Sequence, residues 1–251
     1  MDKTWGLALS GGVARGIAHI GVLKALEEAN IELGYVAGTS SGSLVAALYA
    51  AGVPVRDMEE IALHARWRDL VKISLPRRGL IELGHLGDVL KKITAVTRFC
   101  ELNLPLGVLA CNITSGEKVV LTQGELAPSL QASCAIPGIF HPVRVDGQLL
   151  VDGALVENVP AKTCREMGAQ KVLAVNVSGF RPRGREPSSV LEVMVNTVQI
   201  LAARKLEEET KHADIVISPE VGDLGPTDLD AAETFISRGY QAAWECIKKR
   251  D

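Results

Sequence analysis

The chain has 251 residues, of which 47% are hydrophobic and 4% aromatic, a size and composition that suit a single compact domain spanning residues 1–251. Its 27 basic and 30 acidic residues are interspersed and give a formal net charge of −3, which argues against nucleic acid as the main partner. The five cysteines are scattered without a CxxC pair, so we expect reduced thiols in a cytoplasmic protein, with neither a disulfide framework nor a zinc site.

The N-terminus lacks the pattern of a secretory leader, which combines a basic start, an apolar stretch and a cleavage site. The longest apolar runs, such as residues 44–55, contain Gly and Pro and fall short of the ~18 residues that span a bilayer. We therefore expect any contact with a membrane to be peripheral.

The first hundred residues alternate between predicted strands and helices. Residues 4–9 are predicted to form a buried strand, and the glycine turn at 10–16 leads into a helix with apolar residues at Ile17, Ile20, Leu23 and Leu26. A second strand at 35–37 precedes an apolar helix at 43–51. Residues 57–98 mix helix signals with glycines and a proline, which predicts an irregular insertion or cap.

The rest of the chain continues this alternation. Strands are predicted at 107–113, 118–122, 171–177 and 213–218, with a helix near 125–135 and a hairpin that turns at Asp146-Gly147. Residues 179–189 form a polar loop that we expect to be mobile, and amphipathic helices are predicted at 190–206 and 229–247. This order predicts an α/β fold in which helices sandwich a mostly parallel central sheet.

Residues 38–42 read GTSSG between two apolar stretches. A nucleophilic serine needs a sharp turn at the end of a strand and small neighbours, and Gly-x-Ser-x-Gly supplies both. Counting from Gly38 to Gly42 places Ser40 at the turn. The amide of Ser41 and the start of the following helix would then favour an oxyanion in the same pocket. Short turns of this kind are also common for purely conformational reasons, so the pattern needs support from elsewhere.

A second glycine turn, SGGVARG at residues 10–16, presents backbone N–H groups at the start of a helix, where they can bind an anion. Val13 stands where a dinucleotide-binding GxGxxG pattern needs glycine, and no GK[ST] follows. Nucleotide binding is therefore disfavoured. A turn that only packs a helix on a strand remains the alternative.

The sequence offers a carboxylate as the base for Ser40. Asp152 begins an Asp-Gly-Ala turn with Gly153 and Ala154, whereas the histidines are poorly placed for a triad: His19, His64, His85, His141 and His212. Of these, only His212 follows Asp152 in the order Ser, acid, His, and it lies in a charged helix end. Burial would raise the pKa of an aspartate above ~3.9, and such a dyad depends on oxyanion donors worth ~3 kcal/mol each.

Together these segments resemble the patatin-like phospholipase family, in its short bacterial form. SGGVARGIAHIGVLKALEE resembles its glycine-rich block, VAGTSSGSLVAALYAAG its nucleophile turn, ASCAIPGIFHPV a core segment and VDGALVENVP its Asp block. The resemblance implies the patatin-like three-layer α/β fold, with Ser40 as nucleophile, Asp152 as base and the amides of Gly11, Gly12 and Val13 as the oxyanion hole. It implies a lipid acyl hydrolase that needs no metal, and we expect no cofactor.

Two residues of the glycine-rich block extend or qualify this resemblance. Arg15, followed by Gly16, matches the family's arginine, and it could organise the loop, contact a substrate anion or form a surface ion pair. Val13 departs from the family, which has a third glycine there. If this position has a positive φ, a β-branched side chain would be strained, and its methyl groups would obstruct a passing substrate. Ala154 stands where many members have glycine, which is a small exchange.

We therefore predict a serine hydrolase of the phospholipase, lysophospholipase or carboxylesterase type that cleaves phospholipids, lysophospholipids or related acyl esters. A soluble short-chain esterase or thioesterase remains an alternative, as does a non-catalytic lipid-binding or regulatory protein. Apolar residues of the insertion are candidates for an acyl channel or for membrane contact, with core packing as the alternative: Trp67, Ile73, Leu75, Leu80 and Ile81. The sequence is compatible with homo-oligomers and leaves the natural lipid open.

Overall fold

The computed structural model describes residues 4–70, 72–73, 81–82, 86–178, 186–187 and 189–248. Its central sheet has the strand order β10-β9-β1-β2-β5-β8-β7, and β6 also pairs with β5. The strands are β1 Trp5–Leu9, β2 Leu33–Thr39, β5 Leu106–Asn112, β6 Lys118–Leu121, β7 Val143–Val145, β8 Gln148–Asp152, β9 Lys171–Val175 and β10 Ile215–Ile217. A separate pair consists of β3 Lys72–Ile73 and β4 Ile81–Glu82.

The strands from β10 to β5 run parallel, whereas β6, β7 and β8 pair antiparallel at the other end of the sheet. The predicted α/β fold with a mostly parallel sheet is therefore confirmed. The α-helices are α1 Ala18–Glu28, α2 Ser41–Ala50, α3 Val55–His64, α4 Trp67–Leu70, α5 Leu86–Thr94, α6 Leu126–Ser133, α7 Ala161–Glu166, α8 Val190–Thr210 and α9 Ala232–Lys248. Short 3₁₀ turns are η1 Val13–Ile17, η2 Phe99–Glu101, η3 Gly153–Leu155 and η4 Leu229–Ala231.

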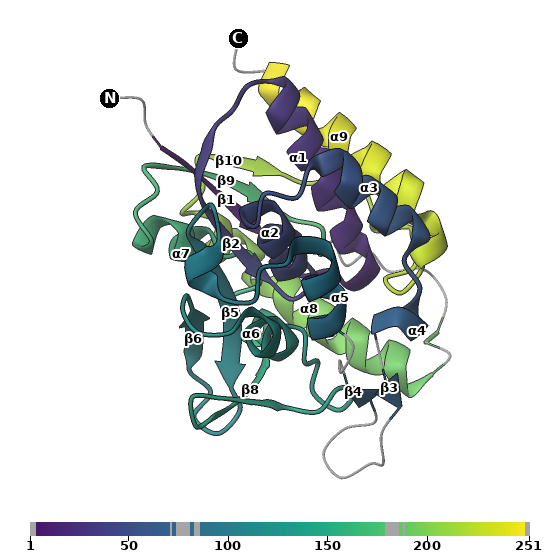
Figure 1. Cartoon of the computed structure of the whole chain (residues 1–251). Coiled ribbons are helices and arrows are strands. Elements are labelled where there is room, and N and C mark those ends of the chain that lie inside the picture. The colour runs from purple at the N-terminus through teal and green to yellow at the C-terminus, as the bar shows by residue number, and fades with distance from the viewer. Residues whose placement is uncertain are drawn as a thin grey trace.

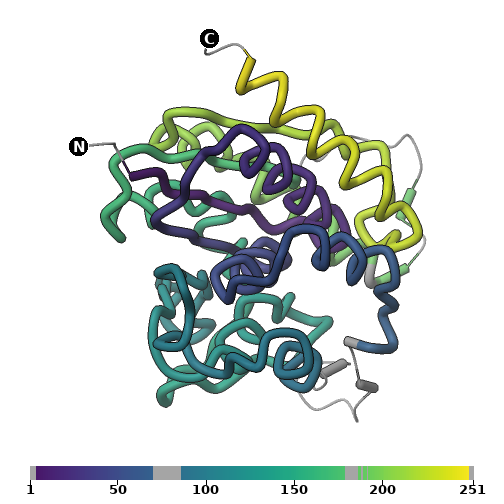
Figure 2. The backbone as a smooth tube through the Cα atoms, turned by 45° about the horizontal axis from the view of Figure 1, so that its top comes forward, coloured from purple at the N-terminus to yellow at the C-terminus, as the bar shows by residue number. Residues whose placement is uncertain are grey.

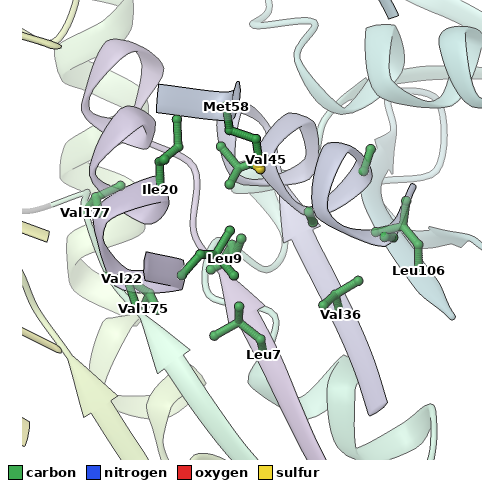
Figure 3. Close-up of a cluster of buried hydrophobic side chains, with 14 of the residues drawn as sticks. Leu7, Leu9, Ile20, Val22, Val36, Val45, Met58, Leu106, Val175 and Val177 are labelled. Atoms are coloured by element: carbon green, nitrogen blue, oxygen red, sulfur yellow. The ribbon is translucent and has the colours of Figure 1, made fainter. Parts of the chain in front are cut away.

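Alternation along the strands produces the two buried faces of the sheet. Leu7 and Leu9 of β1 join the larger apolar cluster with α1, α2 and α9, whereas Ala8 between them joins a second cluster with α7. Figure 3 shows the larger cluster, in which Leu9 lies beside Val22 of α1 and Val45 of α2. Both faces of a parallel sheet are thus covered by helices, as its apolar strands require.

Helices α1 and α9 lie side by side over one face of the sheet (Figures 1 and 2). Their backbones approach closely because each helix carries a glycine at the crossing. A Cβ at Gly21 would lie 1.9 Å from the carbonyl oxygen of Ile236, and a Cβ at Gly239 would lie 2.0 Å from that of Ala18. The C-terminal helix is therefore fixed against the first helix of the chain, next to the glycine turn at residues 10–16.

Several local predictions can be compared directly with the structure. Asp146 and Gly147 have φ angles of 46° and 79° and turn the hairpin between β7 and β8, as the sequence predicted. The stretch 57–98 is more helical than expected, since its described residues include most of α3, α4 and α5. Residues 179–185 and 188 of the loop expected to be mobile lie outside the described residues. None of the described helices combines the length and the apolar character needed to cross a membrane.

Candidate active site

Ser40 occupies the turn between β2 and α2. Its φ of 51° and ψ of −127° lie in a region that residues other than glycine rarely adopt. The turn can form because its neighbours are small: a Cβ at Gly38 would lie 2.5 Å from the carbonyl oxygen of Gly42, and a Cβ at Gly42 would lie 2.3 Å from that of Leu9. The backbone thus presents the Ser40 side chain at the carboxyl end of β2, at the position that the GTSSG pattern predicted.

The glycine turn after β1 lies directly beside Ser40. A Cβ at Gly11 would lie 3.0 Å from the Cβ of Ser40, so the backbone of the turn reaches the nucleophile without an intervening side chain. Within the described residues, the amides of Gly11 and Gly12 donate to no other residue. Val13 has a φ of 57°, so the strain expected of a β-branched residue here is present.

Strand β5 brings the predicted base to the predicted nucleophile. β2 pairs with the first half of β5, where Thr39 is opposite Leu109, and β8 pairs with the second half, where Asp152 is opposite Ala110. Thr39, which precedes Ser40, and Asp152 therefore pair with consecutive residues of β5. At this junction Ser40 and Asp152 line the same small cavity, and the Ser40 side chain is close enough to lower the pKa of the Asp152 carboxyl group.

The end of α6 fixes the backbones of both residues. The amide of Ser40 donates to the Oγ of Ser133 at 2.9 Å, and the amide of Asp152 donates to the carbonyl oxygen of Ala135 at 3.0 Å. Cys134 lies between these two anchors, and burial raises the pKa of its thiol far above the usual range. Its thiol therefore stays protonated beside the site and is not a nucleophile at neutral pH.

The Asp152 carboxyl group is almost completely enclosed, with 1% of the residue exposed. Burial raises its pKa from 3.8 to about 6, and hydrogen bonds from the Ala154 amide, at 2.9 Å from Oδ1, and from Ser40 offset part of the rise. Gly153 packs against the carbonyl of Leu109. A carboxylate with this pKa is ionised at pH 7 and is a stronger base than an ordinary aspartate.

The buried side chain of Arg15 connects the glycine turn to residues 222 and 224. The residue is 1% exposed, and its Nη2 donates to the carbonyl oxygens of Gly222 at 3.0 Å and Leu224 at 2.9 Å. A residue this buried does not lie on the surface, and its contacts join the glycine turn to residues 222 and 224. Gly16 packs against Ser41, since a Cβ there would lie 2.3 Å from the Ser41 Oγ.

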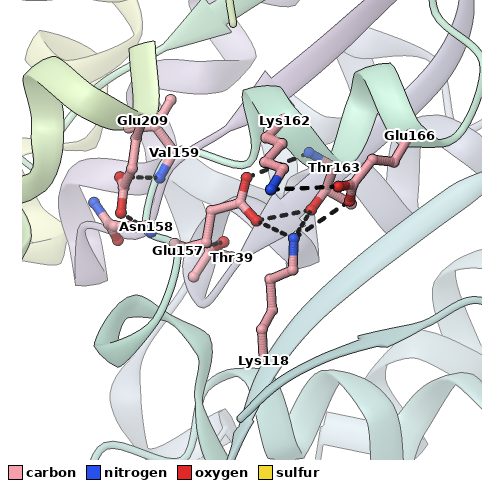
Figure 4. Close-up of polar contacts among 9 residues, drawn as sticks. All are labelled: Thr39, Lys118, Glu157, Asn158, Val159, Lys162, Thr163, Glu166 and Glu209. Carbon is pink, nitrogen blue, oxygen red and sulfur yellow. Dashed lines mark hydrogen bonds and ion pairs between the residues drawn. The ribbon is translucent and has the colours of Figure 1, made fainter. Parts of the chain in front are cut away.

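The segment 157–159 ties the Asp block to four other elements (Figure 4). The Thr39 hydroxyl donates to the Glu157 carbonyl at 2.9 Å, and the buried Glu157 carboxylate accepts from Lys118 of β6 and Thr163 of α7, each at 2.8 Å. Glu209 of α8 accepts the amides of Asn158 and Val159 at 3.0 and 2.8 Å. These contacts hold β2, β6, α7 and α8 around the base.

Two cavities meet at Ser40. The larger, of about 170 Å³, is lined mainly by apolar side chains, including Leu44, Val45, Ala62, Trp67 and Phe140. The smaller, of about 30 Å³, contains the polar residues Asp152, Asn158, Ser178 and Gln199, while Val13, Ser40 and Ile136 border both cavities. Of the other residues expected in an acyl channel, Leu75 and Leu80 lie outside the described residues, as do the side chains of Ile73 and Ile81.

No histidine in the described part of the chain lines either cavity at Ser40. His19 is fully buried with its Nε2 at 2.8 Å from the Ser10 carbonyl oxygen, which makes the protonated Nε2 the donor. His64 and His212 are exposed, His141 borders neither cavity, and His85 lies outside the described residues. Among the described residues, no three His, Cys, Asp or Glu side chains form a group that could hold a metal ion.

Sequence reasoning missed Ser133, Asn158 and Gln199. Gln199 had a usable signal, because it occupies a buried stripe of α8 with Val195, Val198 and Ala202, where a polar residue is unusual. Asn158 lies within the VENVP segment and had no such signal, and neither did Ser133.

Comparisons with known proteins point to one family. The family model described as patatin-like phospholipase matches residues 7–165. An uncharacterized NTE family protein of Mycobacterium tuberculosis is 31% identical over 206 residues, which are 78% of this chain and 56% of that protein. Lysophospholipase NTE1 of Yarrowia lipolytica is 26% identical over 261 residues, 89% of this chain and 18% of that protein.

The crystal structure of VipD from Legionella pneumophila has the same fold, with a TM-score of 0.60 and 16% identity over 99% of this chain and 67% of that one. The chain thus spans 56% of the mycobacterial relative and 18% of the fungal one.

His19 predicts a specific dependence of stability on pH. Burial lowers its pKa from 6.5 to about 4, so between these values the unfolded chain binds a proton that the folded chain does not. The stabilisation is complete above pH 6.5 and is lost as the pH falls towards 4. Urea denaturation should show the unfolding free energy of wild type, relative to His19→Gln, falling by about 3 kcal/mol between pH 7 and pH 4.

Glutamine keeps a donor for the Ser10 carbonyl, and the titration of Asp152 cancels because it is common to both proteins. A difference between the two proteins that stays constant over this range would contradict the assignment of His19 as a buried neutral residue.

Proposed function

The chain belongs to the patatin-like phospholipase family, and we propose that it is a serine hydrolase that cleaves carboxylic esters of lipids with Ser40 and Asp152. The observation that carries the proposal is the meeting of Ser40 and the enclosed Asp152 carboxylate in one cavity, where strand pairing brings them together. A hydroxyl is a weak nucleophile unless a base accepts its proton, and Asp152, whose pKa is about 6, is the base proposed.

In the first step, the Ser40 Oγ attacks the ester carbonyl carbon while Asp152 accepts the hydroxyl proton. The carbonyl oxygen becomes an oxyanion, and the amides of Gly11, Gly12 and Val13 are the donors proposed to hold it. The backbone of this turn packs against Ser40. The amides of Gly11 and Gly12 have no competing acceptor in the described part of the chain. Donors of this kind, fixed before the reaction, account for much of the rate acceleration in acyl transfer.

Asp152 then returns its proton to the leaving alcohol, and the acyl group remains on Ser40 until water releases the fatty acid. A base with a pKa near 6 suits this cycle, since it is ionised at neutral pH yet holds a proton more readily than an ordinary aspartate. Enclosure of the carboxylate thus serves both the acceptance and the return of the proton.

The substrate class proposed is phospholipids, lysophospholipids or related acyl esters. The apolar cavity of about 170 Å³ beside Ser40 supports an acyl chain on that side of the nucleophile. Peripheral contact with aggregated lipid is also proposed, and apolar side chains exposed on α8 support it: Val190, Val193 and Leu201.

A fluorophosphonate probe tests the nucleophile. Wild type and Ser41→Ala should be labelled covalently, whereas Ser40→Ala should not, because Ser40 shares its cavity with Asp152 and Ser41 does not line that cavity. Intact-protein mass spectrometry measures the added mass. Absence of labelling in wild type would favour the non-catalytic alternative, and labelling of Ser40→Ala would assign the nucleophile to another residue.

The pH profile tests the base. Because Asp152 must be ionised to accept the proton, kcat/KM should rise tenfold per pH unit below an apparent pKa of about 6 and level off above it. Asp152→Asn should lower kcat by about 10³-fold or more while circular dichroism stays unchanged. Retained hydrolysis in that variant would transfer the role of base to a histidine.

The apolar cavity predicts a preference for longer acyl chains. With a series of p-nitrophenyl esters, kcat/KM should increase from acetyl to medium-chain esters, and Ala62→Phe should reduce activity on the longer esters selectively because Ala62 lines the cavity. Leu63→Phe is the matched control, since Leu63 is 44% exposed. A flat chain-length series, also with esters presented in bilayers, would favour the short-chain esterase.

A further inference from the structure

The two cavities at Ser40 differ in what they offer the reaction. Asp152 lines the smaller cavity and is not part of the larger one. Every proton that passes through Asp152 is therefore exchanged on the side of the smaller cavity. The proposed acyl chain and the proposed base thus belong to different cavities that share Ser40.

The smaller cavity contains two amide groups with unmet hydrogen-bonding capacity. The Nδ2 of Asn158 and the Nε2 of Gln199 are buried and have no partner among the described residues, although these residues are only 2% and 6% exposed. Buried amide donors without an acceptor are rare, and each calls for an explanation. Here an acceptor inside the cavity would satisfy them.

The two amides belong to different parts of the site. Asn158 is anchored through its backbone to Glu209, and its Oδ1 lies 2.8 Å from the Cβ position of Gly11, so it packs against the oxyanion turn. Gln199 comes from α8, between Val195 and Ala202, which line the same cavity. It is a polar group on an otherwise apolar wall, facing the space that Asp152 also borders.

A volume of about 30 Å³ is enough for one or two water molecules. A water there can accept a hydrogen bond from Gln199 through one lone pair and donate a proton to Asp152. Its second lone pair remains free to attack an acyl group on Ser40. The cavity therefore matches the requirements of a hydrolytic water in size and in polarity.

We propose that Gln199 positions the water that hydrolyses the acyl–Ser40 intermediate, an inference that rests on the proposed function. In this step the water oxygen forms a bond to the acyl carbon and gives its proton to Asp152. The bond between the acyl carbon and the Ser40 Oγ then breaks, and Asp152 passes the proton to that oxygen. The products are the free fatty acid and the regenerated hydroxyl, with no other reactant needed.

Single-turnover kinetics with a p-nitrophenyl ester test the role of Gln199. Intact-protein mass spectrometry follows formation and decay of the acyl–Ser40 species in wild type and in Gln199→Leu, which keeps a similar volume without the amide. We expect acylation to change less than about twofold and decay to slow by about 10- to 100-fold, because the water loses its fixed position. Thr197→Val, on the exposed side of α8, should match wild type.

A second readout separates positioning of water from a structural role. Gln199→Ala enlarges the cavity, so methanol should compete better with water, and the ratio of methyl ester to fatty acid should rise above that of wild type. A merely structural loss of stability would leave this ratio unchanged.

The inference is overturned by slower acylation with unchanged decay, which would mean that Gln199 serves the leaving alcohol. Equal losses in both steps together with an unchanged methanol ratio would also overturn it. A wild-type protein that never forms acyl–Ser40 would overturn the proposed function itself, and this inference with it.

Discussion

The enclosed carboxylate of Asp152 is the group on which the rest of the site depends. A buried charge is costly unless hydrogen bonds stabilise it, and here the Ala154 amide donates one to the carboxylate. The remaining cost appears as a pKa near 6, which is the property that a base for a serine hydroxyl needs. Enclosure therefore limits the stability of the carboxylate and at the same time raises its basicity.

Enclosure requires that many elements converge on one point, and the contacts around segment 157–159 achieve this. Thr39, Lys118, Thr163 and Glu209 reach the segment from β2, β6, α7 and α8. Ser133 and Ala135 accept hydrogen bonds from the amides of Ser40 and Asp152, the proposed nucleophile and base. Because the backbone is held at both ends, Val13 and Ser40 can keep positive φ angles that an isolated chain would avoid.

The two cavities beside the proposed dyad differ in polarity. Apolar side chains from α2 and α3 surround the larger space, whereas α8 closes the smaller one over the base with a glutamine among aliphatic residues. Val13 borders both spaces, so the residue that departs from a third glycine in this turn adds a β-branched side chain to the lining of each.

The sequence by itself determined the local geometry. Steric rules that act over a few residues predict three of its turns. These are the Ser40 turn between Gly38 and Gly42, the glycine turn at residues 10–16 and the Asp146-Gly147 hairpin. The β-strand alternation and helix periodicity likewise predicted most elements of the α/β fold, because burial of one face imposes a regular spacing.

Only the tertiary structure decided which distant groups meet. The pairing of β2 and β8 on consecutive residues of β5 unites Ser40 with Asp152, and the placement of α8 brings Gln199 to the base. Strand order, cavity size and the burial that shifts the pKa of Asp152 depend on contacts between residues far apart in the chain, which no local pattern encodes.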